Sequence, residues 1–348
     1  MEKYELIHRR RFRVAGTILS VALLIIVGAQ LITSSAQRGA WMSSTISKSA
    51  YIDKAGKIVI DASRYERAGK FSDGLAPVKV SRQGWGFIDK AGALVIDPKF
   101  ESTLGFKEGL APVVMNGKWG FINKTGTLVI ANQFDWVAQF SEGVAIVERS
   151  SEFLVIDTNG QVLANLNQKK LSPDIDDARF SEGLMPVLSE EKEAMGYINK
   201  SFEFVIQPQF ERAAPFSEGL ARVALIENGM EKLAFIDKNG KFVVKPAFNT
   251  DYDFLRNSSN FSEGLAALSE GLNTTQTKEE TFVYIDKAGQ IVLATEFFHA
   301  GEFHEGLATV YNSETDRWGF IDKTGKVVIP VEYQGVNDFS EGLALVSR

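Results

Sequence analysis

Two short patterns of apolar and polar residues alternate along the chain from about residue 49 to the C-terminus. In the first, seen as WGFID from Trp85, the Trp and Phe share one face by period-two alternation, a DKxG segment follows, and then a β-branched run such as LVI. Alternation and β-branched residues are typical of strands, and Asp and Gly at these offsets are typical of tight turns. We therefore predict a hairpin at each copy, in which the side chain of the first turn residue accepts hydrogen bonds from amides two or three residues ahead. These turn residues are Asp89, Asn123, Asp237, Asp286 and Asp322.

The second pattern reads FSEGLAPV and begins with a phenylalanine. Its copies are separated by roughly 35 residues or by somewhat more where insertions occur, which is the signature of a repeat architecture. Eight copies begin at Phe71, Phe106, Phe140, Phe180, Phe216, Phe261, Phe303 and Phe339. The GLAPV part predicts another strand, and the Asn-Gly pair at Asn116 favours a two-residue turn into the next WGF strand.

Together the two patterns predict an all-β repeat protein of about eight three-stranded meander units. In the second complete unit the strands are expected near residues 110–115, 119–123 and 127–130, followed by a loop that carries an aromatic residue. A single meander is marginal in water, so the units must stack to bury a continuous apolar seam, with Trp85, Trp119 and Trp318 in the packed core. The glycine beside each Trp-position residue predicts close approach of another backbone; these are Gly86, Gly120, Gly196 and Gly319.

The two ends of the repeat region carry complementary pieces. The region begins with two strands between Ala50 and Ile60 and ends with an unmatched strand at Leu343 to Val346. If the last strand pairs with the first hairpin, the units close into a propeller-like ring without exposed edges. An open superhelical array is the alternative, and pairing of Tyr51 with Leu345 distinguishes the two.

The first forty residues predict an export signal. Residues 14–32 form an apolar run preceded by an arginine cluster, which is long enough to cross a bilayer and orients the N-terminus toward the cytoplasm. The segment is either an uncleaved anchor helix, which leaves the protein membrane-anchored with the repeats outside the cytoplasm, or a signal peptide cut after Ala36, which leaves it secreted or periplasmic. The expected division is residues 1–36 as basic segment and signal, 37–48 as linker, and 49–348 as the repeat domain.

Composition narrows the classes of function. The formal net charge is -6, so the chain lacks the basic excess that binds nucleic acid, and it has no cysteine for disulfides or thiolate sites. No GxSxG, HExxH or phosphate-binding glycine loop occurs, and we expect neither catalysis nor a cofactor.

Two groups of polar residues are candidate ligand sites. The acid of the FSEG signature recurs in all eight copies, but an acid before glycine is ordinary turn chemistry, and equivalent positions lie a whole unit apart. His299 and His304, with Glu302 and Glu305, could form a metal pocket, although a closed site needs further ligands. We therefore predict no metal site.

Insertions around the sixth copy are candidate binding loops, because insertions in repeats map to loops. The polar and aromatic residues singled out there are Asp251, Tyr252, Phe254, Arg256, Asn273 and Lys278. Neutral drift of loop length is the simpler interpretation.

The segments WGFIDKTGKVVI and FSEGLAPV resemble the WG, or KWG, β-repeat family over about residues 49–348. Trp is replaced at Ser49, Phe153, Met195, Leu233 and Phe282, and residues 148–179 keep the pattern poorly. The resemblance implies a binding or scaffold module. Two hypotheses follow: an envelope module that holds an unknown protein partner, or a glycan binder whose indoles would be exposed in a row.

Overall fold

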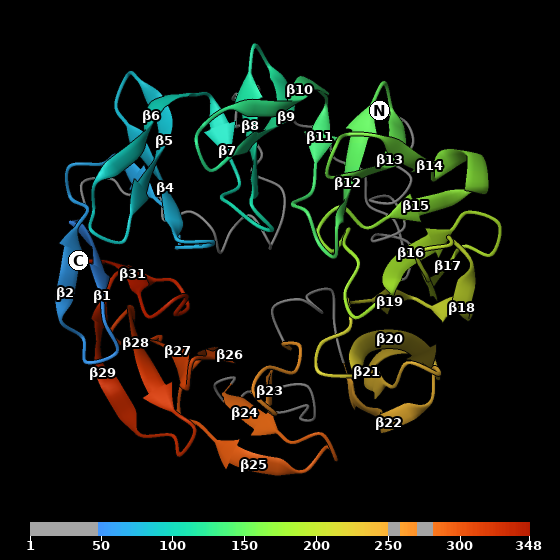
Figure 1. Ribbon diagram of the computed structural model, residues 1–348. Helices are drawn as coiled ribbons and strands as arrows, with labels where there is room; N and C mark the ends of the chain where they lie inside the picture. Colours follow the sequence, from blue (N-terminus) through green and yellow to red (C-terminus); the bar gives the residue numbers. More distant parts are fainter. Residues whose placement is uncertain (1–47, 250–257, 270–280) are drawn as a thin grey trace, which may run out of the picture.

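The computed structural model describes residues 48–249, 258–269 and 281–348, which form a closed ring of eight β-sheets, or blades (Figure 1). Their architecture is a β-propeller. The ring expected from the complementary ends is confirmed, and the open array is wrong. The predicted N-terminal helix and the candidate loop residues Asp251, Tyr252, Phe254, Arg256, Asn273 and Lys278 lie outside the described residues.

We number the blades in chain order. The first four comprise, in turn, β3 (Arg67–Ala68), β4 (Leu75–Val80), β5 (Gly84–Asp89) and β6 (Leu94–Phe100); β7 (Ser102–Thr103), β8 (Leu110–Met115), β9 (Lys118–Asn123) and β10 (Leu128–Phe134); β11 (Trp136–Val137), β12 (Val144–Arg149), β13 (Glu152–Asp157) and β14 (Val162–Asn165); and β15 (Leu171–Pro173), β16 (Met185–Ser189), β17 (Ala194–Ile198) and β18 (Phe204–Phe210). A short 3-10 helix, η1 (Asn167–Lys169), precedes β15.

The other four blades complete the circle. They comprise β19 (Arg212–Ala213), β20 (Ala221–Glu227), β21 (Met230–Ile236) and β22 (Phe242–Asn249); β23 (Ala266–Ser269), β24 (Phe282–Ile285) and β25 (Ile291–Ala294); β26 (His299–His304), β27 (Leu307–Asn312), β28 (Arg317–Asp322) and β29 (Val327–Tyr333); and, in blade 8, β30 (Gly335–Val336), β31 (Ala344–Ser347), β1 (Ser49–Ile52) and β2 (Ile58–Asp61).

The prediction of three strands per unit is wrong for seven of the eight blades, which have four. The missed strand is the innermost one, which is only two residues long in five blades, too short to show any alternation. In blade 6 that position is reduced to a single bridge between Ser258 and Leu268 among the described residues. The three predicted strands of blade 2 are present, but β10 continues to Phe134, so the expected loop aromatic ends a strand instead.

Strand exchange between the chain ends closes the ring. β1 pairs antiparallel with β31, and Tyr51 lies opposite Leu345. Blade 8 therefore takes two strands from each end of the described chain, so the ring closes through a complete four-stranded sheet.

The hairpin turns follow the expected chemistry with one change of offset. Asp89 Oδ1 accepts the amides of Ala91 and Ala93, both at 2.9 Å, so the second acceptor contact is four residues ahead rather than three. The glycine after each Trp-position residue lies against the outermost strand of its own blade: a Cβ at Gly86 would stand 2.5 Å from the Ile96 carbonyl oxygen. A β-bulge brings that strand across the glycine.

The core lies between neighbouring blades. One cluster joins Phe87 and Ile96 of blade 1 to Phe106 and Val113 of blade 2, all nearly inaccessible to solvent. Because each blade buries its faces against two neighbours, the expected continuous apolar seam is present.

Ring closure can be tested by a disulfide, since the chain has no cysteine of its own. Lys48 and Arg348 exchange both backbone hydrogen bonds, so the next pair, Ser49 and Ser347, is a non-hydrogen-bonded pair with closely spaced Cα atoms. We expect the variant S49C/S347C to form a disulfide in mild oxidant and to gain about 2 to 4 kcal/mol in free energy of unfolding. Thiol titration and melting with and without reductant measure both effects.

The matched control is the single variant S347C, which should melt alike with and without reductant. Failure of the double variant to lose its free thiols would contradict the pairing of the chain ends.

Candidate functional site

The acidic residue of each FSEG signature occupies a strained backbone position. In the first copy, Ser72 and Leu75 exchange backbone hydrogen bonds, and the two residues between them have φ of 54° (Asp73) and 85° (Gly74). Positive φ at both central residues is the type I′ turn, which prefers Asn-Gly because a longer side chain costs about 1 kcal/mol or more in this region. All eight copies repeat this geometry with Asp or Glu at φ of 53–55°. Turn chemistry alone therefore does not explain the acid.

Each of these carboxylates hydrogen-bonds the FSEG turn of the next blade. The Glu182 carboxylate, for example, accepts the Gly219 amide at 3.0 Å. We call this repeated contact the clasp. The acceptor and donor pairs are Asp73 and Gly109, Glu108 and Gly143, Glu142 and Gly183, Glu182 and Gly219, Glu218 and Gly264, Glu263 and Gly306, Glu305 and Gly342, and Glu341 and Gly74. The last pair joins the two ends of the repeat region.

In six blades a lysine of the DKxG turn also meets the clasp carboxylate. The nitrogen to oxygen distances are 3.0–3.2 Å for Lys54 and Glu305, Lys90 and Glu341, Lys200 and Glu142, Lys238 and Glu182, Lys287 and Glu218, and Lys323 and Glu263. Such half-exposed ion pairs contribute little alone, so the amide hydrogen bond is the stronger part of the clasp.

The clasp accounts for the recurring acids without a bound cation. Burial acts to raise the pKa of Glu182, but hydrogen bonds from the Gly219 amide and from Lys238 outweigh it and leave the pKa lowered. The same balance lowers the pKa of Glu263 and Glu305. Among the described residues, no group of three His, Asp or Glu side chains is arranged to hold a metal ion.

The eight signature phenylalanines are wedges between blades. Phe71, Phe106, Phe140, Phe180, Phe216, Phe261, Phe303 and Phe339 are each at most 3% exposed. Seven pack against an aromatic ring of the preceding blade, with ring centroids 4.8–4.9 Å apart, as Phe121 does with Phe140. The eighth, Phe180, lies in an aliphatic cluster with Val155.

The tryptophans of the first signature do not form an exposed row. Trp85 is 5% exposed, and Trp119 and Trp318 are half-buried against core clusters. Each lies opposite the aromatic residue that ends the outermost strand, as Trp85 does Phe100.

The two histidines of the body are not brought together. His299 packs against the rings of Phe282 and Trp318, whereas His304 Nε2 lies 3.5 Å from Glu302 and 3.8 Å from Asp338. Glu305, the fourth member of the suspected metal group, is committed to the clasp with Gly342 and Lys54.

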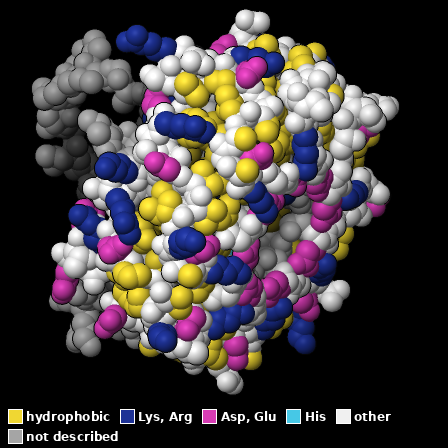
Figure 2. Space-filling view, turned by 60° about the vertical axis from the view of Figure 1, so that its left-hand side comes forward, with side chains coloured by type: hydrophobic (Ala, Val, Ile, Leu, Met, Phe, Trp, Pro, Cys, Tyr) yellow, Lys and Arg dark blue, Asp and Glu magenta, His cyan; other side chains and the backbone are white. Residues whose placement is uncertain are grey.

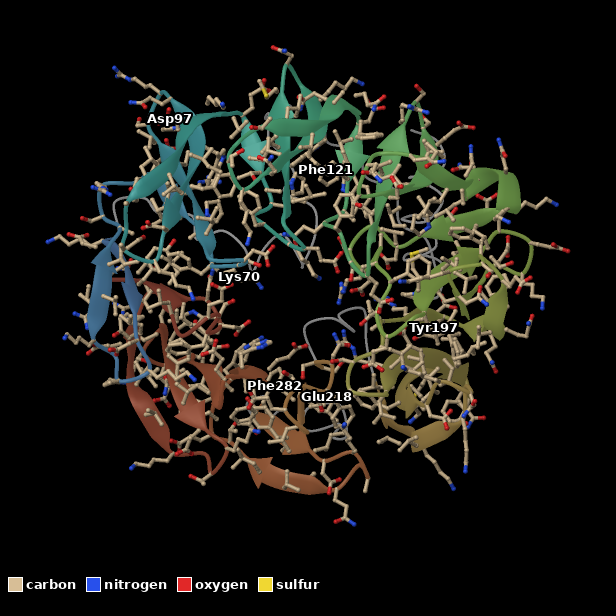
Figure 3. All side chains as sticks on the ribbon, viewed as in Figure 1. Lys70, Asp97, Phe121, Tyr197, Glu218 and Phe282 are labelled. Atoms are coloured by element: carbon tan, nitrogen blue, oxygen red, sulfur yellow. The ribbon has the colours of Figure 1, made fainter. Side chains whose placement is uncertain are left out.

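Charged side chains line the inner rim of the ring, and only Glu302 and His304 among them were considered from the sequence, as part of a possible metal group. They occupy the positions directly before and after the signature phenylalanine: Lys70, Lys107, Arg179, Glu302, His304 and Asp338. Figure 3 shows Lys70 at the inner margin of the ring. The sequence does show a signal for two of them: six copies have serine directly after the phenylalanine, whereas Lys107 and His304 take that place in the other two.

The outer circumference carries exposed aliphatic side chains on every blade. In most blades the third residue of the run that follows the turn is buried, as Ile60 and Ile96 are, because the turn glycine of the next blade lies against it. The first two are left exposed, at 37–58%, except in blade 4, where only the second is exposed. These residues, the outer band, are Ile58, Val59, Leu94, Val95, Leu128, Val129, Val162, Leu163, Val205, Phe242, Val243, Ile291, Val292, Val327 and Val328.

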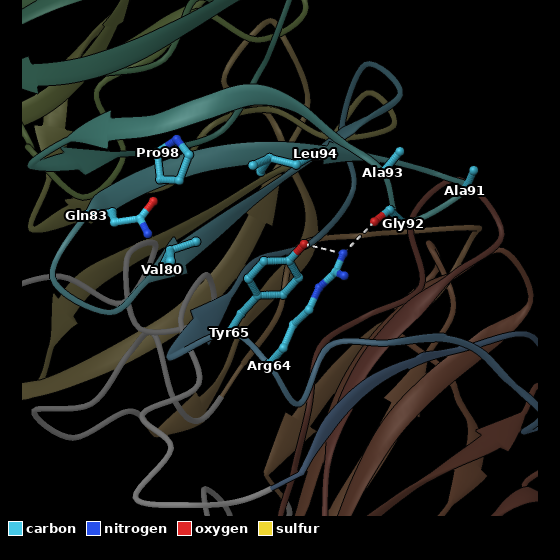
Figure 4. Close-up of a pocket in the computed structure, with 9 residues that line it drawn as sticks. All are labelled: Arg64, Tyr65, Val80, Gln83, Ala91, Gly92, Ala93, Leu94 and Pro98. Atoms are coloured by element: carbon cyan, nitrogen blue, oxygen red, sulfur yellow. Dashed lines mark hydrogen bonds between the residues drawn. The ribbon is translucent and has the colours of Figure 1, made fainter.

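The outer band interrupts an otherwise charged surface. Figure 2 brings the side of the ring with β2 forward and shows apolar side chains gathered in patches among Lys and Arg. One shallow pocket lies there, between blades 8 and 1 (Figure 4). In this pocket Arg64 donates to the Tyr65 hydroxyl at 2.7 Å and to the Gly92 carbonyl at 2.9 Å. The guanidinium that lines the pocket therefore already has acceptors within the protein.

Fold and clasp together define a class: a closed eight-bladed β-propeller built from one repeated sequence unit. The family described as "WG containing repeat" matches residues 50–81, 85–119, 119–150, 195–225, 234–271, 284–313 and 318–348, which is more than half of the chain. The chain belongs to this WG-repeat family. Within the repeat region, the longest unmatched stretch, 151–194, includes the region where the sequence pattern is poorest. No curated protein matches the chain.

Several solved structures are similar in shape. The computationally designed Ika8 protein aligns with a TM-score of 0.51 at 12% identity, covering 80% of this chain and 91% of that one. BamB from Moraxella catarrhalis (TM-score 0.34, 10% identity, 81% and 84% covered) and a streptogramin B lyase (TM-score 0.38, 11% identity, 86% and 98% covered) are more distant. At these identities the likeness to Ika8 concerns the fold alone.

The clasp and the residue preference of the type I′ turn predict opposite changes in stability for one substitution. Glu182→Asn places the preferred residue in the type I′ turn but removes the carboxylate, which makes a charge-assisted hydrogen bond to the next blade. We expect the free energy of unfolding to fall by about 1 to 2 kcal/mol at neutral pH, measured by urea denaturation.

Arg82→Asn is the matched control, because Arg82 has φ of 63° in an exposed hairpin turn. It should be neutral or slightly stabilising. Since the folded pKa of Glu182 is lowered, its contribution is present above the ordinary value of 4.5 and is lost as pH falls through the folded pKa, so the stability deficit of E182N relative to the wild type should disappear in acid, whereas R82N should show no such change. A more stable E182N would show that the acid is only a turn residue.

Proposed function

We propose that this chain is a non-catalytic protein-interaction scaffold of the cell envelope, and that its partner binds the outer band. The supporting observation is that every blade leaves aliphatic side chains exposed on its outermost strand. Desolvation of such side chains favours association by about 25 cal/mol per Å² of apolar surface removed from water. Exposed aliphatic patches in a charged surround are typical of protein contact sites.

The backbone of the outermost strands supports the same proposal. β6, β10 and β29, for example, each have a neighbouring strand on one side only. An edge strand can accept an extended segment of a partner through main-chain hydrogen bonds, while its side chains supply specificity. Repetition around the ring presents this surface several times, which raises avidity for a partner with more than one such segment.

The glycan alternative has weaker support. Aromatic stacking on sugar rings requires accessible indole faces, whereas Trp85 is buried and Trp119 and Trp318 are half-buried. In the outer band only Phe242 carries a ring, and a single phenylalanine does not form a row for stacking.

The envelope part of the proposal rests on the apolar run at residues 14–32 and the arginines before it. In the described part of the chain, no helix has the length and apolar character needed to cross a membrane.

Site-specific photo-crosslinking in intact cells tests the partner surface. A photoreactive residue is placed in the full-length protein at Val95 or Val129 of the outer band, and at Ile226 as control. Ile226 is similarly exposed, at 54%, but it lies near the turn of the β20–β21 hairpin and is not part of the outer band. We expect protease-sensitive crosslinked products at both band positions, at least about tenfold stronger than at the control.

Crosslinks of equal strength at all three positions would contradict a role of the outer band. Protease-resistant products, together with retention of the protein on purified peptidoglycan, would favour the glycan alternative.

Export can be tested separately, because the chain contains no cysteine. The exposed Lys192 is replaced by cysteine, and spheroplasts are treated with a membrane-impermeant maleimide. We expect labelling before lysis, since the positive-inside rule places the repeats outside the cytoplasm. Labelling only after lysis would place the repeats inside, and the mass of the recovered protein distinguishes the anchor from cleavage after Ala36.

A further inference from the structure

The position after each signature phenylalanine has a structural task in most blades. In five copies it is a serine whose hydroxyl donates to the phenylalanine carbonyl of the next blade at 2.6–2.8 Å: Ser141 to Phe180, Ser181 to Phe216, Ser217 to Phe261, Ser262 to Phe303, and Ser340 to Phe71. In blades 2 and 7 this serine is replaced by Lys107 and His304. Both replacements forgo that hydrogen bond, so the fold does not require them.

Charges also gather at the position before the phenylalanine in the same sector. Going around the ring, blade 7 has Glu302, blade 8 has Asp338 and blade 1 has Lys70. Together with Lys107 and His304 they form a continuous stretch of the inner rim over blades 7, 8, 1 and 2, the polar sector.

The acidic side of the polar sector is held in place. Glu302 Oε1 accepts the Asn260 amide at 3.1 Å, and His304 Nε2 lies between Glu302 and Asp338 at 3.5 and 3.8 Å. Solvent still reaches these groups, because the Glu302 and Asp338 side chains are 30% and 41% exposed. The hydrogen bond that His304 donates to Glu302 raises the pKa of His304, with a further contribution from Asp338.

The basic side consists of Lys70, whose charge acts to lower the pKa of both Asp338 and His304, and of Lys107. Within the described residues neither Lys70 nor Lys107 forms an ion pair, and the carboxylates nearest Lys107, Asp73 and Glu108, are held by clasp amides. Burial lowers the pKa of Lys107, and Arg179 and Lys70 add to the effect. An ammonium group in this position gains from any anion that reaches it.

We propose that the polar sector binds a small zwitterion that carries both an amine and a carboxylate, such as a free amino acid or a short peptide. The carboxylate would lie against Lys70 and Lys107, and the amine against Glu302 and Asp338. A purely anionic ligand would be repelled by the acidic side and a purely cationic one by the basic side, so only a bipolar ligand gains from both. This site is independent of the outer band.

Calorimetric titration of the purified full-length protein with alanyl-alanine tests the proposal, with the N-acetylated and the C-amidated dipeptides as companions. We expect the free dipeptide to bind with a Kd below about 1 mM at low salt, and each blocked form to bind at least about tenfold more weakly.

Two variants assign the two ends. Lys107→Ser restores the residue of the other copies, and Asp338→Asn introduces the residue that blade 6 has at the same position, so both should fold with unchanged melting temperature. We expect K107S to bind the free and the C-amidated dipeptides equally, and D338N to bind the free and the N-acetylated ones equally. Lys192→Ser, which removes an exposed lysine from a hairpin turn, should bind like the wild type.

Absence of binding by the wild type would overturn the proposal, as would equal binding of all three dipeptides. Wild-type affinity in both K107S and D338N would exclude the polar sector as the site. Melting temperatures measured in parallel separate loss of binding from loss of fold.

Discussion

The contact between successive FSEG turns is the interaction on which this architecture depends. A lone four-stranded sheet cannot bury aromatic residues on both faces, and each blade here has its core only at its two boundaries. The signature supplies one element to each part of that boundary: the phenylalanine ring packs on the preceding blade, the serine hydroxyl donates to the next phenylalanine carbonyl, and the acid accepts the next glycine amide. The acid is kept in a strained backbone conformation in all eight copies. The strain is offset because the carboxylate satisfies an amide that another turn leaves free.

This contact also explains why closure is favoured over an open array. In an array the first turn would lack an acceptor for its Gly74 amide, and the Glu341 carboxylate would lack its donor; in the ring these two bond each other. Pairing of β1 with β31 then completes the sheet that the two chain ends would otherwise leave with unpaired inner strands. Closure completes the same contact that joins every other pair of blades, so it needs no special sequence at the ends.

Much of the fold could be predicted from the sequence, because strands with alternating faces and Asp-x-x-Gly turns are local features. The hairpins, the number of units and the exchange of end strands in the ring follow from them. The two-residue inner strands could not be predicted, since β7 or β11 is too short to show a period. The role of Glu182 was missed for a different reason: neither its positive φ nor its partner Gly219 on the next blade is visible in a local pattern. The exposure of Val95 beside the buried Ile96 depends on a glycine one blade away, which is equally non-local.

In a repeat protein, a residue that recurs in all copies is first of all needed at the boundary between blades. Recurrence alone therefore does not identify a binding residue. Two kinds of surface escape that requirement. The outer band repeats without serving the core, and a surface that recurs around a ring suits a partner that binds at several points. The polar sector, in contrast, exists once, where Lys107 and His304 replace the serine that five other blades use. A single departure from an eightfold pattern breaks the symmetry of the ring, and a ligand much smaller than a blade can be recognised only where that symmetry is broken.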